Sequence, residues 1–125
     1  MAIVKNIEID GKEIPFRASA DIPRRYRTQF GRDIMKDMAI LEKLTKGKDA
    51  EYSDIPPECL TMFENIAYTM AKHADKSIPD DPDEWLDEFT VFSIYTILPK
   101  LVELWGLNEM TVSEQKKRLS PPTGK

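Results

Sequence analysis

The chain is poor in the residues that most often carry out chemistry. Its 125 residues include one cysteine, one histidine and five glycines. Cys59 has no second cysteine with which to form a disulfide, which favours a reducing, intracellular environment. No second histidine or cysteine stands near His73 at metal-ligand spacing, and the sequence contains no glycine-rich phosphate loop or nucleophile motif. We therefore expect a protein that is not an enzyme and that uses neither a metal nor a cofactor.

The sequence also lacks a basic surplus and a long apolar run. Its formal net charge at pH 7 is −4, whereas nucleic-acid-binding domains are usually basic. No apolar run reaches the roughly 18–20 residues of a membrane span, and the N-terminus has no signal-peptide layout. With 41% hydrophobic and 32% charged residues, the chain is expected to form one soluble domain in the cytoplasm, without a membrane partner.

The first 18 residues predict a β-hairpin. Isoleucines alternate with other residues over 3–9, and a second β-favouring run follows Asp10 and Gly11. Asp-Gly between two such runs favours a type I′ turn, whose central residues need a positive φ. Pro15 has no backbone N–H, which places the second strand at a sheet edge. Because a lone hairpin is only marginally stable, we expect residues 2–18 to pack on helices.

Two stretches show apolar side chains at helical spacing. The first runs over 21–44 and contains Gly31, which costs on the order of 1 kcal/mol relative to alanine inside a helix. The second runs over 55–74, with Ser53 or Asp54 as its expected N-cap. The residues that form the first stripe are Tyr26, Phe30, Ile34, Met38 and Leu41.

The segment from Trp85 to Trp105 is the most apolar part of the chain. Its side chains are apolar on nearly every side, whereas a surface helix needs only one apolar stripe. We predict a helical region that is either the central rod of a small bundle or partly covered by another protein chain. Pro82 suits its first turn. Pro99 removes one helical hydrogen bond, so the region bends there or divides into two packed segments.

Four arginines cluster over 24–32 and form a candidate electrostatic contact surface. They support an alternative function, that of a small nucleic-acid-binding or regulatory protein. A second interpretation is that these charges are solvated or pair with the acidic residues of 80–88, and the acidic net charge favours it. The four are Arg24, Arg25, Arg27 and Arg32.

Several blocks of residues follow one another in a fixed order along the chain. The first block, over 16–38, reads FRASADIPRRYRTQFGRDIMKDM, and a second over 64–75 reads ENIAYTMAKHAD. Shorter blocks follow: EWLDEF over 84–89, IYTILP over 94–99 and LW over 104–105. Together they span most of residues 14–108. None is a catalytic signature. In their order and spacing, the blocks resemble tail assembly chaperones of long-tailed phages and prophages of Gram-positive bacteria.

The resemblance implies a chaperone that binds and solubilises the tape measure protein during tail morphogenesis in the bacterial host cytoplasm. Members of this family coat the tape measure protein before tail tube subunits polymerise around it, so the tail tube protein and self-association into a homo-oligomer are further expected interactions. Many members also have a longer form made by a −1 ribosomal frameshift. Codons for Gly124 and Lys125, or for Lys116 and Lys117, could form a slippery heptamer, which the DNA sequence would decide.

We therefore expect an α+β fold, mainly α, with a hairpin over 2–18 packed on a bundle of about four helices over 21–108. The globular domain would cover 1–110, and the polar residues 111–125 would form a flexible tail. Four methionines are either core filling or adaptable contacts for a client, namely Met35, Met38, Met62 and Met70. The expected partner-binding surface is leftover apolar area, and its residues are Phe89, Phe92, Tyr95, Trp105 and Leu107.

Overall fold

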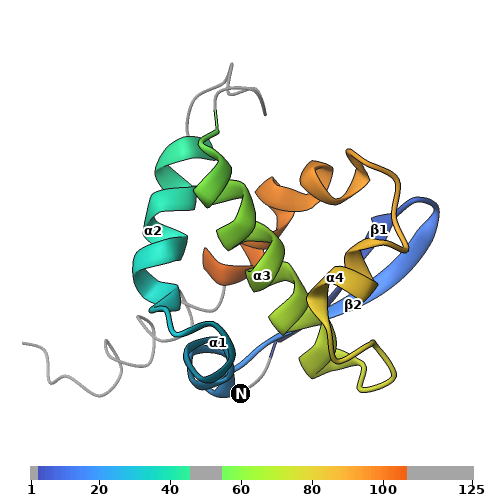
Figure 1. The fold of residues 1–125 in the computed structure, drawn as a ribbon, viewed down its shortest axis with the longest axis horizontal. Helices are drawn as coiled ribbons and strands as arrows, with labels where there is room; N and C mark the ends of the chain where they lie inside the picture. The colour runs from blue at the N-terminus through green and yellow to red at the C-terminus, as the bar shows by residue number, and fades with distance from the viewer. Residues whose placement is uncertain (1–2, 46–54, 107–125) are drawn as a thin grey trace, which may run out of the picture.

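A computed structural model describes residues 3–45 and 55–106. In these ranges a two-stranded antiparallel hairpin precedes a set of packed helices (Figure 1), which confirms the predicted mainly α, α+β class. None of the described helices is both long and apolar enough to span a bilayer. The elements are β1 (Ile3–Ile9), β2 (Lys12–Ala18), α1 (Asp21–Phe30), α2 (Ile34–Thr45), α3 (Pro57–Ala74), α4 (Pro82–Leu86), the 3₁₀ helix η2 (Ser93–Ile97) and a last helix over 98–106.

The hairpin has the predicted two-residue turn. Asp10 and Gly11 have φ values of 54° and 78°, as a type I′ turn requires. The strands pair from Ile9 with Lys12 back to Ile3 with Ala18. Side chains alternate between the two faces, so that one face packs on the helices and the other meets solvent. The fully buried members are Ile7, Ile9, Phe16 and Ala18.

The predicted stripe over 21–44 belongs to two helices and not to one. Gly31 has a φ of 67° and caps the end of α1, where its N–H donates to the carbonyl of Arg27. A left-handed residue at this position is the usual way to end a helix, and it favours glycine. A Cβ at Gly31 would meet no atom within 4 Å, so the glycine does not serve close backbone approach.

Helix α3 is the central element of the described fold, and it spans Pro57–Ala74 where the sequence predicted a helix over 55–74. It packs against β2, α1, α2 and α4, and it lies between α2 and the hairpin in Figure 1. Its N-cap is Pro56, without a side-chain hydrogen bond. The expectation of Ser53 or Asp54 as the N-cap was therefore wrong, because the helix begins at Pro57. Half of its 18 residues are buried, which makes it the helix on which the others are assembled.

The apolar segment from Trp85 to Trp105 is not one continuous helix. Helix α4 ends at Leu86, turns follow, and η2 leads into the helix over 98–106. Pro99 lies in the first turn of that last helix, where a missing N–H costs no helical hydrogen bond. The break between the helices therefore lies about ten residues before Pro99, the position at which the sequence predicted it. The predicted C-terminal tail over 111–125 lies outside the described residues.

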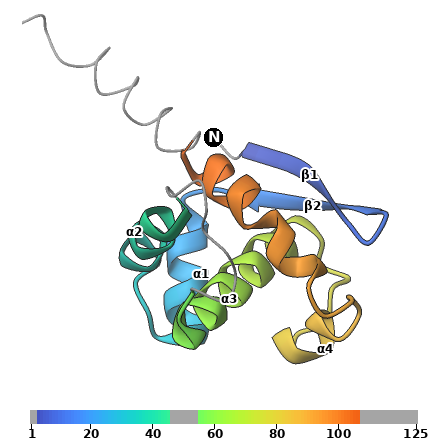
Figure 2. The ribbon, with the colours of Figure 1, turned by 90° about the horizontal axis from the view of Figure 1, so that it is seen from above.

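A contact from the hairpin explains where the break occurs. The carboxylate of Asp10 accepts hydrogen bonds from the backbone N–H of Thr90 at 2.9 Å, from its hydroxyl at 2.9 Å and from the hydroxyl of Ser93 at 3.1 Å. These bonds satisfy polar groups of the turn. One of them is a backbone N–H that would donate to a carbonyl of the preceding helical turn if the helix continued. In Figure 1 and Figure 2, α4 and the hairpin turn share one end of the molecule, and α2 lies at the other.

Candidate partner-binding surface

Two neighbouring apolar side chains, the Val91–Phe92 pair, are the most exposed large hydrophobics of the described chain. Val91 is 77% exposed and Phe92 is 69% exposed. Both lie in the turn between α4 and η2. Scattered exposed apolar residues are ordinary, but two adjacent ones in a fixed turn form a candidate contact site for a partner. Three further large hydrophobics are exposed elsewhere, namely Val4 on the outer face of the hairpin and Met35 and Ile40 on α2.

The turn that carries the Val91–Phe92 pair is fixed by the hairpin. Asp10 bonds to Thr90 immediately before the pair and to Ser93 immediately after it. The backbone hydrogen bond from Thr90, followed by the two hydroxyl bonds, lowers the pKa of Asp10 despite some opposing desolvation. The carboxylate is therefore ionised at neutral pH. The exposed pair thus belongs to an anchored turn, which is held at the N–H and hydroxyl of Thr90 and at the hydroxyl of Ser93.

The structure separates the residues that the sequence predicted as one binding surface. Phe92 is exposed as expected, and Phe89 and Tyr95 are half-buried. Trp105 does not fit the prediction, because it is 2% exposed and belongs to the core. Leu107 lies outside the described residues. The predicted surface does not include Val91, because the turn that exposes it is not visible in the sequence.

Tyr95 connects this region to α3. Its hydroxyl donates to a carboxylate oxygen of Glu64 at 2.6 Å, and its ring lies 6.1 Å from the ring of Phe63. Burial, together with the hydrogen bond to Glu64, raises the pKa of Tyr95 to about 12. Tyr95 thus chiefly connects the region of the exposed turn to α3, and it is less suited to contact a partner.

A groove lies beside the turn, along the outer edge of β2. Four consecutive residues, Lys12–Pro15, line it together with the loop after α3 and residues of α4. We call this the edge groove, and its volume is about 230 Å³. The contributions of the loop and of the α4 region are Asp75, Ser77, Ile78, Pro79, Trp85, Glu88 and Phe89.

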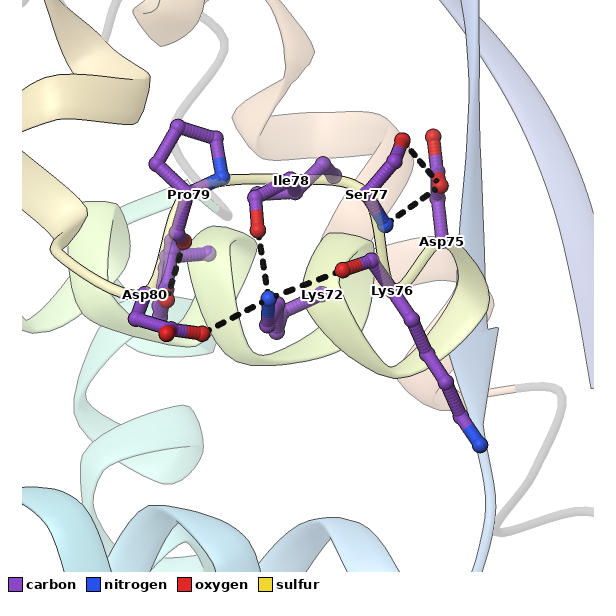
Figure 3. A network of polar contacts seen from close by, with 8 residues as sticks. Lys72, Asp75, Lys76, Ser77, Ile78, Pro79 and Asp80 are labelled. Atoms are coloured by element: carbon purple, nitrogen blue, oxygen red, sulfur yellow. Dashed lines mark hydrogen bonds and ion pairs between the residues drawn. The ribbon is translucent and has the colours of Figure 1, made fainter.

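Lys72 holds the loop wall of the edge groove (Figure 3). Its ammonium donates to the carbonyl of Lys76 at 3.0 Å and to the carbonyl of Ile78, and it forms an ion pair with Asp80 at 2.9 Å. A single side chain of α3 therefore gathers three acceptors from the loop that follows. Hydrogen bonds to a charged group are among the stronger ones in proteins, so this loop has a defined shape.

Further bonds fix the loop and the floor beneath it. The carboxylate of Asp75 accepts from the N–H of Ser77 at 3.0 Å and from its hydroxyl at 2.6 Å. The hydroxyl of Tyr68 donates to the carbonyl of Pro79 at 2.6 Å. The ring of Tyr68 contacts Trp85 edge to face, at 5.9 Å between centroids, and Trp85 contacts Phe89 edge to face at 5.1 Å. Wall and floor are thus built before any partner arrives.

The arginine cluster does not form a single basic surface. Arg24 and Arg27 are exposed, but Arg25 pairs with Asp21 at 2.7 Å. Arg32 donates two hydrogen bonds to the carboxylate of Asp37, at 2.8 and 2.9 Å.

Local carboxylates therefore match two of the four arginine charges. The acidic residues of 80–88 do not take part in these two pairs. This local pairing weakens the electrostatic case for nucleic acid.

The remaining candidate groups are structural where the chain is described. Burial raises the pKa of the Cys59 thiol, which is 5% exposed and packs in the core. The ring of His73 is half-buried, with its Nε2 3.0 Å from the hydroxyl of Ser19. Burial, helped by nearby arginines, lowers the pKa of His73. Over residues 3–45 and 55–106 no three side chains of the His, Cys, Asp and Glu types gather as metal ligands would.

Comparison with known proteins adds no relative to this description. No protein-family model, no curated protein and no solved structure matches the chain.

Proposed function

We propose that this protein is a tail assembly chaperone that binds the tape measure protein and keeps it soluble during tail morphogenesis in the host cytoplasm. The order of the blocks over 16–38, 64–75 and 84–105 supports this function. The observation that carries the proposal is the anchored Val91–Phe92 pair, with 77% and 69% of the two side chains exposed. Burying one such side chain against a client would contribute about 1.5–3 kcal/mol.

The placement of the other exposed hydrophobics supports a further part of the proposal, self-association into a coat. Met35 and Ile40 lie on α2, at the end of the molecule opposite the α4 turn (Figure 1). A subunit with apolar contacts at opposite ends can hold a client with one and a neighbouring subunit with the other. The tail tube protein and a frameshifted longer form of this chain are the other proposed partners.

Co-expression with the tape measure protein of the same phage or prophage tests the proposed function. The wild-type protein should raise the soluble fraction of the tape measure protein, and the double variant Val91→Ser, Phe92→Ser should lose most of this effect. Val4→Ser is the matched control, because Val4 is 57% exposed on the outer face of the hairpin. A soluble fraction that is the same with and without the wild-type protein would refute the proposal.

A further inference from the structure

We propose that the edge groove is an anchor site for a client segment in which one large apolar side chain is flanked by lysine or arginine. The inference rests on the proposed function, because the tape measure protein supplies the segment. The proposal adds the residue types that the client segment must have and the part of the surface that binds them.

The size and lining of the groove indicate a side chain as the ligand. Its volume of about 230 Å³ lies below the roughly 300–1,000 Å³ of pockets that enclose small molecules. Its apolar lining residues include Ile14, Pro79 and the edge-to-face rings of Trp85 and Phe89. A single leucine-sized or phenylalanine-sized group can be covered here, while its own backbone stays at the surface.

The charges around the groove determine which residues of the client segment can flank its apolar side chain. Among the lining residues, Glu13, Asp75 and Glu88 supply three carboxylates and Lys12 supplies one ammonium. The charge of Lys72 also acts on Asp75, but Lys72 is paired with Asp80. Lys12 also lies near Asp10, on whose carboxylate its charge acts. The balance is therefore negative, and the exposed acidic residues of α4 extend it. A segment with basic residues beside its apolar anchor complements this rim, and an acidic segment is repelled.

The strand edge limits how the segment can lie. The sheet has the order β1–β2, so within residues 3–45 and 55–106 no other strand pairs with the outer edge of β2. Ile9 and Lys12 form the hydrogen-bonded pair next to the turn, and from there non-hydrogen-bonded and hydrogen-bonded pairs alternate along the hairpin. The backbone groups of Glu13 and Pro15 therefore point away from β1. Pro15 has no N–H, which stops a long strand from adding here. The fit is a short extended stretch, held by one or two main-chain bonds near Glu13 and by its anchor side chain.

The groove is preformed and continuous with the exposed turn. Lys72 and the Asp75 turn fix its wall (Figure 3), so little ordering is needed when a segment binds. Phe89 lines the groove and precedes the Val91–Phe92 pair by one residue, Thr90. The anchor site and the exposed pair therefore offer one client two adjacent contacts.

Fluorescence anisotropy with labelled peptides tests the inference directly. The probe is a short peptide with phenylalanine between lysines, compared with peptides in which glutamates replace the lysines or alanine replaces the phenylalanine. The full-length protein should bind the first peptide and neither of the others. For Glu13→Lys or Glu88→Lys we expect a Kd about five- to tenfold higher at low salt. Glu58→Lys is the control, because Glu58 is exposed at the opposite end of α3.

Equal binding of the lysine and glutamate peptides, or equal effects of Glu88→Lys and Glu58→Lys, would overturn the inference. A concentration-dependent dimer that Glu88→Lys abolishes would assign the groove to a second copy of the chain, and would overturn it as well. Co-expression separates this inference from the proposed function. If the Glu88→Lys protein solubilises the tape measure protein as well as wild type does, the groove is not an anchor and the chaperone function stands. Peptide binding without any solubilising effect would reject the function alone.

Discussion

Replacing Asp37 with alanine should remove the most deeply buried polar network of the described chain. The Asp37 side chain is 2% exposed and accepts three hydrogen bonds, one from the hydroxyl of Tyr26 at 2.6 Å and two from Arg32. Tyr26 itself is fully buried, whereas Arg32 is about half exposed. After the substitution Arg32 can turn to water, but the Tyr26 hydroxyl would be left in the core without an acceptor.

The expected cost combines two contributions. Losing hydrogen bonds to a charged group costs about 1.5–3 kcal/mol, and leaving a buried hydroxyl unpaired costs about 1–3 kcal/mol. Together they lower the free energy of unfolding of Asp37→Ala by about 3–5 kcal/mol. Tyr26→Phe should cost only about 1–2 kcal/mol, because Asp37 keeps both bonds from Arg32. The double variant should be no less stable than Asp37→Ala, since the orphaned hydroxyl is gone.

Urea unfolding of the four proteins measures this coupling. Asp33→Ala is the control, because Asp33 is an exposed carboxylate that caps the N–H of Met35, and its loss should cost about 1 kcal/mol. If Asp37→Ala costs less than the control, or the two substitutions simply add, the network does not stabilise the fold as argued.

The pKa of Asp37 gives the same network a pH signature. Burial by itself raises this pKa, but the hydrogen bonds from Arg32 and Tyr26 outweigh burial and lower it below 3.8. A carboxyl with a lowered pKa in the folded state stabilises the protein above its unfolded pKa. This stabilisation is lost as the pH falls through the folded pKa. The acid limb of the stability curve should therefore be shallower in Asp37→Asn than in wild type.

Three other predictions concern the two core tryptophans, the glycine that ends α1 and the tyrosine beneath the exposed turn. Trp85→Ala and Trp105→Ala should each cost about 3–5 kcal/mol in urea unfolding, because both rings are 2% exposed; an unchanged midpoint would place them outside the core. Gly31→Ala should cost about 1–2 kcal/mol, since its φ is 67°, and a rise in melting temperature would contradict the left-handed cap. Tyr95, with a pKa raised from 10.0 to about 12, should stabilise the fold below pH 10.0 and lose this effect as the pH rises through 12. Tyr95→Phe should remove that alkaline loss, and an unchanged alkaline limb would show that its hydrogen bond to Glu64 is unimportant.

Local signals in the sequence were sufficient for the hairpin and for α3. Asp10 and Gly11 specify a turn that only a few residue types adopt, and the stripe of α3 is long and regular. Gly31 was misread because α1 and α2 both pack on α3, so their apolar positions keep one period across the break. Only the left-handed conformation of the glycine distinguishes a cap from a helix interior, and periodicity does not report it.

The break after α4 could not be predicted from its own neighbourhood. Its polar partner is Asp10, 80 residues away in sequence from Thr90, and such a contact leaves no local pattern. Only part of the candidate partner-binding surface could be predicted from the sequence. Phe92 could be named from composition, but an all-apolar segment does not tell which side faces inward, and Trp105 proved to be core. The edge groove combines residues of 12–15, 75–79 and 85–89, which only the fold brings together.

Calorimetric titration of a soluble fragment of the tape measure protein into the purified chain tests the central claim most directly. If the protein acts by covering apolar surface of a client, binding should occur with a negative heat-capacity change. It should be lost in the Val91→Ser, Phe92→Ser variant and kept in Val4→Ser. No heat of binding at any temperature, or equal binding by both variants, would contradict the claim that the anchored apolar turn recognises the tape measure protein.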